Sequence, residues 1–397
     1  MAILTKRFPP QRCGVGDYAA QLAGALQAQG HAVEVFIASH AETRPEDFHA
    51  HEITLDGAED IESAVKTITA SKPEVVLIEY SGYAWGRWGI PFWMNRFVFR
   101  LRRTGVRVAV ALHEISISAR RHPRWALLAL AQQAHAWLLA AAAHDVIVNT
   151  PERAAMLRRW LFWRRSAVHY RPNSSNIPVT AMNQTQRSDL RASRGAKENT
   201  LVIAVFGLFA AWKKYEEVIR AVSRLREKLD VRLWLLGDAA SADQNYIAQL
   251  HKLISAENVD EICWWSGPLA AEELSAHLQA ADVFVLPQED GDLTRSGAFM
   301  AAAAHGLPCI AVRNYVNQAA FRHGENVWMV VRSTAADFYA AVENIATQQA
   351  LRSNLGRNLR ALYCQKFAIE QAVARLPFLK DVVSPAMPRL KTESLKS

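Results

Sequence analysis

Residues 283–313 read VFVLPQEDGDLTRSGAFMAAAAHGLPCIAVR, and this stretch decides the fold. Its first four residues are apolar and predict a buried strand, a polar loop follows at 287–296, and an alanine-rich run at 297–305 predicts a helix. A Gly-Leu-Pro stop at 306–308 ends that helix, and a second apolar strand follows at 309–312. Together these elements predict one βαβ unit, whose polar loop lies at the carboxyl end of a strand.

The loop of this unit carries side chains that suit a phosphate. In open α/β sheets, ligands bind at the carboxyl ends of strands, where helix N-termini offer free N–H groups and a positive dipole end. Thr294, Arg295, Ser296 and Gly297 add hydroxyls, a guanidinium group and a glycine there. Taken alone, the segment fits an ordinary strand-to-helix connection with a solvated arginine equally well.

The alternation of strands and helices continues through both halves of the chain. In the first half we predict strands at 2–5, 31–38, 73–80, 106–112, 145–149 and 167–170. In the second half we predict them at 201–207, 231–237, 262–267, 283–286, 309–312 and 328–331. Helical runs separate the strands, so each half is expected to form a doubly wound sheet.

A polar segment at 181–199 interrupts the alternation and is interpreted as the linker between two domains. We therefore expect an N-terminal domain at 1–180, a second domain at 200–366, and a terminal helix with a polar tail at 367–397. The expected fold class is α/β, with two Rossmann-like domains facing each other across a cleft.

Composition fits a two-domain globular protein with anionic ligands. At 397 residues the chain exceeds one ordinary core, and 50% of it is hydrophobic. Lys and Arg outnumber Asp and Glu by 46 to 38, which favours nucleotide phosphates, nucleic acid or an anionic membrane as partners. The four cysteines have no metal or redox spacing, and MAILTKRFPP lacks the apolar core of a secretion signal. We therefore expect free thiols and a cytoplasmic protein.

A glycine loop follows the first strand. Gly14 and Gly16 let a ligand approach the backbone at the start of a helix. The third glycine of GxGxxG is absent and no acidic residue follows at the expected distance, which disfavours a nicotinamide dinucleotide fold. A tight turn without a ligand fits the same two glycines.

His113 directly follows an apolar strand and stands next to Glu114. Its place at the carboxyl end of the sheet favours a functional role over a purely structural one.

Polar loops also follow the strands of the second half. Lys213 and Lys214 follow its first strand, where at least one of them suits a diphosphate clamp, although adjacent lysines are usually solvated. Gly237 and Gly267 end the next two strands and are candidates for shaping a pocket for a base and a ribose.

Two segments mix aromatic and basic residues: YAWGRWGIPFWMNRFVFRLRR at 83–103 and RRWLFWRR at 158–165. This mixture is typical of a membrane interface. Stacking on single-stranded nucleic acid uses the same residue types, and ordinary helix burial explains much of the first segment. The apolar run at 126–143 contains Gln and His residues and predicts a buried or surface-lying helix rather than a membrane span.

With these residues in place, nearly the whole chain resembles the GT-B glycosyltransferases, specifically family 4 of nucleotide-sugar-dependent retaining enzymes. The motifs follow the order of that family: CGVGDYAAQLAGALQAQGHAVEVF, IEYSGYAWGRWG, ALHE, HDVIVNTPE, RPNSSNIP, FGLFAAWKKYEEVIRAV, LWLLGD, WWSGPLAAEELSAHLQAADVFVLP and AAAAHGLPCIAV. IEYSGYAWGRWG followed by ALHE is similar to the bacterial exopolysaccharide branch.

The resemblance implies transfer of a sugar from a nucleotide donor to a glycan or polyprenyl-linked acceptor, with no metal ion and no cofactor. It implies catalytic roles for His113 and Arg295. It implies donor binding by a larger set of residues: Gly14, Gly16, Lys213, Lys214, Gly237, Gly267, Ser296 and Gly297. The aromatic-basic segments would then dock the first domain on the inner leaflet of the membrane.

The chain departs from the family pattern at three positions. Leu208 stands where the family has an arginine that follows a glycine. The paired glutamates of the family, separated by seven residues, map onto Leu293 and Ala301, so both carboxylates are missing. Thr294 to Gly297 resembles an Arg-Ser loop of some relatives, and the nearby acidic residues are candidates for a displaced carboxylate: Glu289, Asp290 and Asp292.

Two other functions fit the same motifs. A catalytically impaired GT-B subunit would bind a nucleotide-sugar or support a partner enzyme, and the missing glutamates favour it. A nucleotide-sugar 2-epimerase shares the two-domain architecture and would act without an acceptor. Nucleic-acid binding is disfavoured, because the basic residues form no recognisable module.

Overall fold

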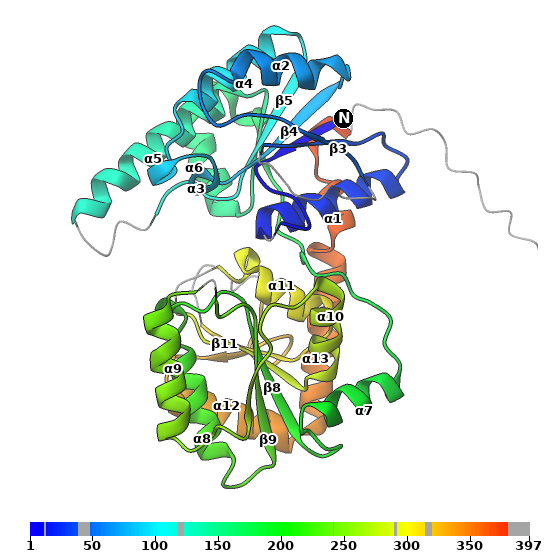
Figure 1. The fold of residues 1–397 in the computed structure, drawn as a ribbon, viewed down its shortest axis with the longest axis vertical. Coiled ribbons are helices and arrows are strands. Elements are labelled where there is room, and N and C mark those ends of the chain that lie inside the picture. The colour runs from blue at the N-terminus through cyan, green and yellow to red at the C-terminus, as the bar shows by residue number, and fades with distance from the viewer. Residues whose placement is uncertain are drawn as a thin grey trace, which may run out of the picture.

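The protein is built on two parallel β-sheets, one in each of two stacked domains (Figure 1). The computed structural model describes residues 1–11, 13–38, 48–117, 123–240, 242–289, 292–313 and 320–379. The predicted fold class, α/β with two Rossmann-like domains, is confirmed.

The first sheet has seven parallel strands in the order β3-β2-β1-β4-β5-β6-β7. The strands are β1 Ala2–Thr5, β2 Glu34–Ile37, β3 His49–Glu52, β4 Val75–Tyr80, β5 Arg107–Leu112, β6 Asp145–Val148 and β7 Val168–Tyr170. Six of them lie within predicted strands, because runs such as VVLIEY are apolar enough to be buried on both faces. Strand β3 was not predicted, since its sequence HAHE is polar and it lies at the exposed edge beside β2.

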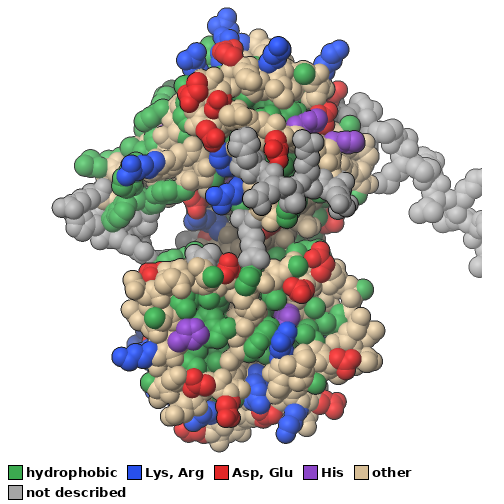
Figure 2. All heavy atoms as spheres, viewed as in Figure 1, with side chains coloured by type: hydrophobic (Ala, Val, Ile, Leu, Met, Phe, Trp, Pro, Cys, Tyr) green, Lys and Arg blue, Asp and Glu red, His purple; other side chains and the backbone are tan. Residues whose placement is uncertain are grey.

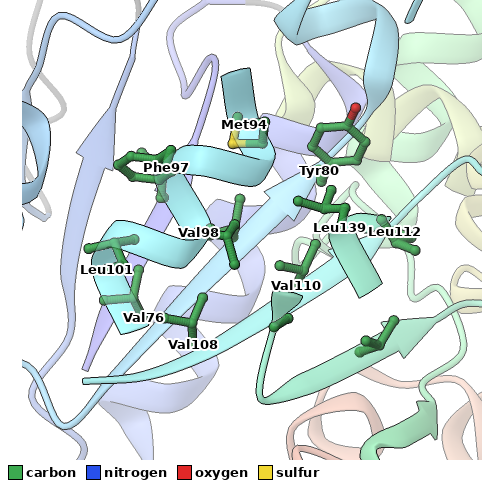
Figure 3. Close-up of a cluster of buried hydrophobic side chains, with 14 of the residues drawn as sticks. Val76, Tyr80, Met94, Phe97, Val98, Leu101, Val108, Val110, Leu112 and Leu139 are labelled. Atoms are coloured by element: carbon green, nitrogen blue, oxygen red, sulfur yellow. The ribbon is translucent and has the colours of Figure 1, made fainter. Parts of the chain in front are cut away.

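Helices cover both faces of this sheet (Figure 1). They are α1 Gly14–Ala28, α2 Ile61–Ala70, α3 Gly82–Trp85, η1 Arg87–Gly89, α4 Trp93–Arg103, α5 Pro123–Ala142, α6 Pro151–Trp160 and η3 Phe162–Ala167. Figure 3 shows α4 over the sheet, where Phe97 and Val98 pack on strand residues such as Val76 and Val108. Each such side chain contributes roughly 1.5–3 kcal/mol on burial. No helix of the described residues is long and apolar enough to cross a membrane.

The second sheet has six parallel strands in the order β10-β9-β8-β11-β12-β13. Its strands are β8 Leu201–Phe206, β9 Val231–Leu236, β10 Cys263–Trp265, β11 Val283–Leu286, β12 Cys309–Val312 and β13 Trp328–Val330. The elements between and after them are η4 Ala211–Lys213, α8 Tyr215–Leu225, α9 Gln244–Ala256, α10 Ala271–Ala280, η5 Leu293–Arg295, α11 Gly297–Ala304, α12 Ala335–Thr347 and α13 Gln349–Lys366. Thus β11, α11 and β12 form the predicted βαβ unit.

The segment expected as the linker contains a helix, α7 Gln184–Ser193. A reciprocal capping box between Asn183 and Gln186 starts it. The helix packs against α10 of the second domain, and its buried Arg191 pairs with Asp282 at 2.9 Å.

The chain returns to the first domain after α13. Helix α14 Ile369–Val373 packs against α1, and the short helix η7 Pro377–Leu379 follows it. Val373, Leu376 and Phe378 join the buried cluster that contains residues of α1. The core of the first domain therefore includes residues from far along the sequence.

Candidate active site

A cavity of about 370 Å³ lies where the second domain faces the first. We call it the donor cavity, after the donor-binding role that the resemblance implies for several of its residues. Its walls come from the end of β8, the η4 turn, the loop after β11, the start of α11 and one residue of the segment joining the domains: Asn176, Phe206, Gly207, Leu208, Trp212, Lys213, Gln288, Asp292, Arg295, Ser296, Gly297 and Ala298. Figure 2 shows the gap between the domains, with Lys and Arg side chains on its upper rim.

Lys213 is the buried cation of this cavity, with 8% of its surface exposed. Burial lowers the pKa of its amino group to about 8. Among the described residues, no carboxylate lies within ion-pair distance of Nζ, which instead approaches the ring of Trp212 at 5.4 Å. Gly207 lies beside it with a φ of +123°, a backbone conformation that favours glycine, and a Cβ there would lie 2.9 Å from Nζ. A buried cation of this kind is complementary to an anionic ligand.

Lys214, unlike Lys213, lies outside the donor cavity and pairs with a carboxylate. Its backbone adopts the left-handed conformation (φ 57°), and its Nζ pairs with Glu289 at 2.5 Å. Lys214 lines no part of the donor cavity, so of the two lysines only Lys213 remains a candidate for the expected diphosphate clamp. Glu289 is therefore engaged away from the cavity wall.

The loop after β11 brings Arg295, Ser296 and Gly297 to the cavity, as the sequence predicts. The Ser296 hydroxyl accepts a hydrogen bond from the Phe299 N–H at 3.2 Å and so caps α11. The helix N-terminus with its positive dipole end faces the cavity at Gly297. Arg295 is exposed, and it also borders a second cavity on the first domain.

Asp292 stands in the same loop and is buried, with 7% exposed. Its Oδ1 accepts a hydrogen bond from the Thr294 N–H at 2.8 Å and another from the Thr294 hydroxyl. Asp292 therefore lines the donor cavity as a carboxylate close to Arg295. Of the other two candidates for a displaced carboxylate, Glu289 is paired with Lys214, and Asp290 lies outside the described residues.

The positions expected for the glutamate pair are apolar and buried. Leu293 is 4% exposed and Ala301 is fully buried, and both belong to the core beneath α11. Leu208, at the position of the arginine, is 53% exposed and lines the donor cavity.

Two more of the predicted glycines belong to the second domain but lie outside the donor cavity. Gly237 and Gly267 form an isolated backbone bridge, and neither lines the donor cavity. A Cβ on Gly237 would lie 2.7 Å from the carbonyl oxygen of Gly207, so Gly237 allows the Gly207 loop to approach closely.

Gly14 and Gly16 lie in the first turn of α1 and do not line the donor cavity either. A Cβ on Gly16 would lie 2.4 Å from the Arg7 carbonyl oxygen, which explains the glycine by close packing. The neighbouring Asp17 contacts the site through a hydrogen bond with Asn176, which lines the donor cavity. Burial raises its pKa to about 6, against a smaller opposing effect of its hydrogen bond with Asn176 of the donor cavity.

His113 belongs to a buried ionic network in the first domain. Its Nε2 lies 2.6 Å from Oε2 of Glu79, which also pairs with Arg171 at 3.0 Å. Burial alone would raise the pKa of Glu79, but Arg171 and His113 together lower it below its ordinary value. The ring of His113 is thus fixed by Glu79, and His113 lines neither the donor cavity nor the second cavity. Its catalytic role stays a prediction.

A second cavity, of about 610 Å³, opens on the first domain, and we call it the acceptor-side cavity. Trp212 and Arg295 border both cavities and join them across the gap. The other wall residues come from the first domain: Tyr80, Gly82, Tyr83, Gly89, Glu114, Ile115, Ser116, Ile117, Trp125, Gln132, His135 and Ala136. Burial lowers the pKa of His135 to about 4, and its Nε2 lies 2.8 Å from the Tyr80 hydroxyl.

Arg153 lies between the buried network of His113, Glu79 and Arg171 and the charged residues of the second domain. Its Nη1 donates to the carbonyl oxygen of His113 and to Oδ1 of Asn149, both at 2.7 Å. Burial and the charge of Arg295 lower the pKa of Arg153 to about 10, against smaller opposing effects of Glu114 and Asp292. Arg153 therefore lies within electrostatic range of charged groups from both domains.

Sequence reasoning missed Glu79, Arg171, Arg153 and Trp212. Glu79 had a signal, since it is the one charged residue of the apolar strand VVLIEY and such residues are rarely buried without a partner. Arg171 directly follows β7 at the cleft edge, in the same way as His113 follows β5.

Comparison with known proteins agrees with this architecture. Residues 186–362 match the family described as glycosyl transferases group 1. D-inositol 3-phosphate glycosyltransferase of Pseudarthrobacter chlorophenolicus is 29% identical over 176 residues, which cover 43% of this chain and 40% of that protein. The lipopolysaccharide core biosynthesis glycosyltransferase LpsE of Rhizobium meliloti is 31% identical over 165 residues, which cover 42% of this chain and 45% of that protein. The chain therefore spans less than half the length of these two relatives.

Comparison of whole structures shows similarity over both domains. HepE of Anabaena, solved in complex with UDP and glucose, superposes with a TM-score of 0.74 at 17% identity, over 96% of this chain and 100% of that one. At this identity the similarity shows the fold. The chain thus has the GT-B fold, and its residues 186–362 are similar to the glycosyl transferases group 1 family.

Proposed function

We propose that the protein is a glycosyltransferase that moves a sugar from a nucleotide-sugar donor to a glycan or lipid-linked acceptor. The observation that carries this proposal is Lys213, a buried cation without a carboxylate partner among the described residues, next to Arg295 and the N-terminus of α11 in the donor cavity. Fixed cations and helix N–H groups at one place are complementary to a diphosphate.

The proposed chemistry follows from where charge develops. The bond between the sugar C1 and the diphosphate oxygen breaks, and its electron pair stays on the departing nucleoside diphosphate. The acceptor hydroxyl oxygen bonds to C1, and its proton passes to the departing phosphate or to solvent. Lys213, Arg295 and the α11 N-terminus stabilise the departing charge, which is usually the largest contribution to catalysis of this kind. The resemblance to family 4 supports retention of the configuration at C1.

The relatives suggest donor and acceptor classes. HepE binds UDP and UDP-glucose, which makes these two the first probes for this chain. The match to LpsE supports a role in surface polysaccharide or exopolysaccharide synthesis. We propose the acceptor-side cavity as the place of the acceptor, because it joins the donor cavity at Trp212 and Arg295.

The test is a screen of nucleoside diphosphates and nucleotide-sugars for thermal stabilisation, followed by assays of hydrolysis and transfer. A donor that binds the native state must raise its stability, by about 2.7 kcal/mol at a hundredfold excess over Kd. Binding without turnover would favour the impaired subunit, and conversion of a UDP-sugar without an acceptor would favour the 2-epimerase. Absence of any stabilisation would contradict the proposal.

Most of the exposed large hydrophobic side chains among the described residues belong to the first domain, and we call the surface that carries them the apolar face. Of the fourteen exposed large hydrophobic side chains among the described residues, ten lie between residues 83 and 163. They are Tyr83, Trp88, Phe92, Phe99, Trp125, Leu127, Leu130, Leu138, Phe162 and Trp163. Figure 2 shows hydrophobic side chains along the left edge of the upper domain, where Figure 1 places α5. Arginines of α4, α6 and η3 accompany them, so we propose that this face docks peripherally on the anionic inner leaflet.

Removing two leucines from this face is expected to weaken membrane binding about tenfold. Leu127 and Leu130 are 74% and 61% exposed, so Leu127→Ser with Leu130→Ser removes insertable apolar surface and leaves the core intact. The measurement is co-sedimentation with vesicles that contain anionic phospholipid. The matched control is Val331→Ser, since Val331 is 70% exposed on the second domain. Equal binding by both proteins would contradict docking through this face.

A further inference from the structure

A third cavity, of about 370 Å³, lies in the first domain, and we call it the basic cavity. It lies along β7, the edge strand of the first sheet, and at the amino ends of β5 and β6, which Arg107 and Asp145 begin. The acceptor-side cavity lies at the opposite ends of the strands, where Tyr80 ends β4 and Glu114 follows β5. The described wall of the basic cavity shares no residue with the two cavities of the cleft: Arg107, His144, Asp145, Ser166, Ala167, His169, Arg375 and Pro377.

Asp145 is the one carboxylate in the described wall of the basic cavity, and both of its oxygens are engaged. Its Oδ2 accepts a hydrogen bond from Nε of Arg107 at 2.8 Å, and its Oδ1 lies 3.0 Å from Nε2 of His169. Burial alone would raise the pKa of Asp145, but these two neighbours lower it below its ordinary value. The charge of this carboxylate is therefore compensated within the wall, so it does not by itself exclude an anion.

Arg375 brings a cation to the basic cavity from the segment that returns to the first domain after α13. Its guanidinium carbon lies 5.6 Å from the centre of the Tyr170 ring. Within the ranges that the structure describes, no carboxylate lies within ion-pair distance of Arg375. A guanidinium group without a carboxylate presents a fork of N–H donors that matches two oxygens of a phosphate.

His144 adds a hydrogen-bond donor to the same wall. Its Nδ1 accepts a hydrogen bond from the Val108 N–H at 3.0 Å, so the proton of the neutral ring is on Nε2. In the part of the chain that the structure describes, this Nε2 has no partner. The donor is therefore available to a ligand in the cavity.

Three arginines make the electrostatic potential at His144 positive. Burial and the charges of Arg102, Arg164 and Arg107 lower the pKa of its ring, against the opposing charge of Asp145. Arg102 and Arg164 also donate hydrogen bonds of 2.6–2.7 Å to carbonyl oxygens of residues 141–143, at the end of α5. These bonds offset the negative end of the helix dipole, which would otherwise repel an anion.

We propose that the basic cavity binds the phosphate group of a small phosphate monoester. Arg375 contacts two oxygens of the phosphate, and the Nε2–H of His144 and the hydroxyl of Ser166 donate to it. A phosphate monoester carries about −1.5 to −2 charges at neutral pH, which suits a wall in which the one carboxylate is compensated. The volume of about 370 Å³ leaves room for the alcohol part of the ester. This site is independent of the proposed donor and joins the C-terminal segment to η3 and β6.

The test is calorimetric binding of glycerol 3-phosphate to the wild-type protein and to two variants of the wall. Arg375→Met removes the guanidinium group. Ser166→Asp places a second carboxylate at the exposed end of η3, where the serine hydroxyl has no partner among the described residues. Each variant is expected to weaken binding about 10- to 100-fold, as for loss of a hydrogen bond to a charged group. Ser166→Asp keeps the test decisive if Arg375→Met disturbs the packing of the C-terminal segment.

The matched control is Arg159→Met, since Arg159 is exposed on α6 and lines none of the three cavities. It is expected to leave the affinity unchanged. Lys213→Met shows whether the phosphate binds in the donor cavity instead, and it is also expected to leave the affinity for glycerol 3-phosphate unchanged. Loss of binding in Lys213→Met, with normal binding by Arg375→Met and Ser166→Asp, would overturn the assignment.

Vesicles distinguish a lipid headgroup from a free ligand, because phosphatidate carries the same glycerol 3-phosphate group. Co-sedimentation with phosphatidylcholine vesicles, with and without phosphatidate, compares the same variants. Binding of free glycerol 3-phosphate supports the site with a soluble ligand. Binding of phosphatidate vesicles alone, lost in both Arg375→Met and Ser166→Asp, supports it with a lipid headgroup. If neither assay showed binding that depends on Arg375 and Ser166, the assignment would be wrong, whether or not the protein transfers sugars.

Discussion

Lys213→Met is expected to slow sugar transfer strongly while it stabilises the folded protein. Loss of the cation at the departing diphosphate removes charge stabilisation in the transition state, so kcat should fall about 100- to 1000-fold. The gain in stability comes from burial, which lowers the pKa of Lys213 from 10.5 to about 8 and so makes the charged form unfavourable in the fold. Removing it should raise the free energy of unfolding at neutral pH by on the order of 3 kcal/mol.

The stability difference between Lys213→Met and the wild type is expected to depend on pH. Below about pH 8 the lysine is charged in both the folded and the unfolded protein, so the full destabilisation is present. Between about 8 and 10.5 the unfolded protein holds the proton and the folded protein does not, so wild-type stability approaches that of the variant as pH rises. Donor affinity of the wild type should fall over the same rise, because the diphosphate needs the charged amine.

The matched control is Lys214→Met, which breaks a partly exposed pair with Glu289. Such pairs contribute about 0–1 kcal/mol, so activity and stability should change little. Denaturant unfolding and steady-state kinetics measure both quantities. If the two variants lost activity equally, Lys213 would not be the diphosphate clamp.

Arg171→Met is expected to have the largest effect on stability, a loss of about 3–5 kcal/mol. Arg171 compensates the charge of Glu79, which is fully buried and also pairs with His113. Removing Arg171 leaves the buried carboxylate of Glu79 with His113 as its remaining ion-pair partner. The double variant Glu79→Leu with Arg171→Met should regain part of the loss, since no unpaired charge then remains. Urea unfolding of the single and double variants measures this coupling.

The control for this pair is Arg100→Met. Arg100 pairs with Glu62 at 2.7 Å on the surface, with side chains 40% and 57% exposed, and its loss should cost less than about 1 kcal/mol. If Arg171→Met and Arg100→Met destabilised the protein equally, the buried network would not hold the first domain together as we infer.

The strands were predictable because burial on both faces imposes apolar runs, as in 75–80 and 201–206. Strand β3 and helix α7 were missed because both are polar, and tertiary contacts decide their structure. Helix α7 did carry a local signal, since Asn183 and Gln186 have the spacing of a capping box.

The sequence predicts which loops form the candidate site, but not which side chains and atoms of those loops face the cavity. The sequence indicates which loops follow strands, and four of its candidates in the loop after β11 line the donor cavity, as Lys213 also does. It could not separate Lys213 from Lys214, because the left-handed backbone of Lys214 depends on the folded turn. Nor could it show that Asp292 has one engaged and one free oxygen, which depends on the η5 turn.

The return of α14 to α1 has a consequence for the order in which the protein is made. A ribosome releases residues 1–180 long before Val373, Leu376 and Phe378, which fill part of the core next to α1. The domain that is synthesised first therefore becomes complete last, and its apolar face stays uncovered while the second domain is made. For the same reason, a fragment cut at residue 180 would expose that face and is expected to aggregate rather than fold as an independent unit.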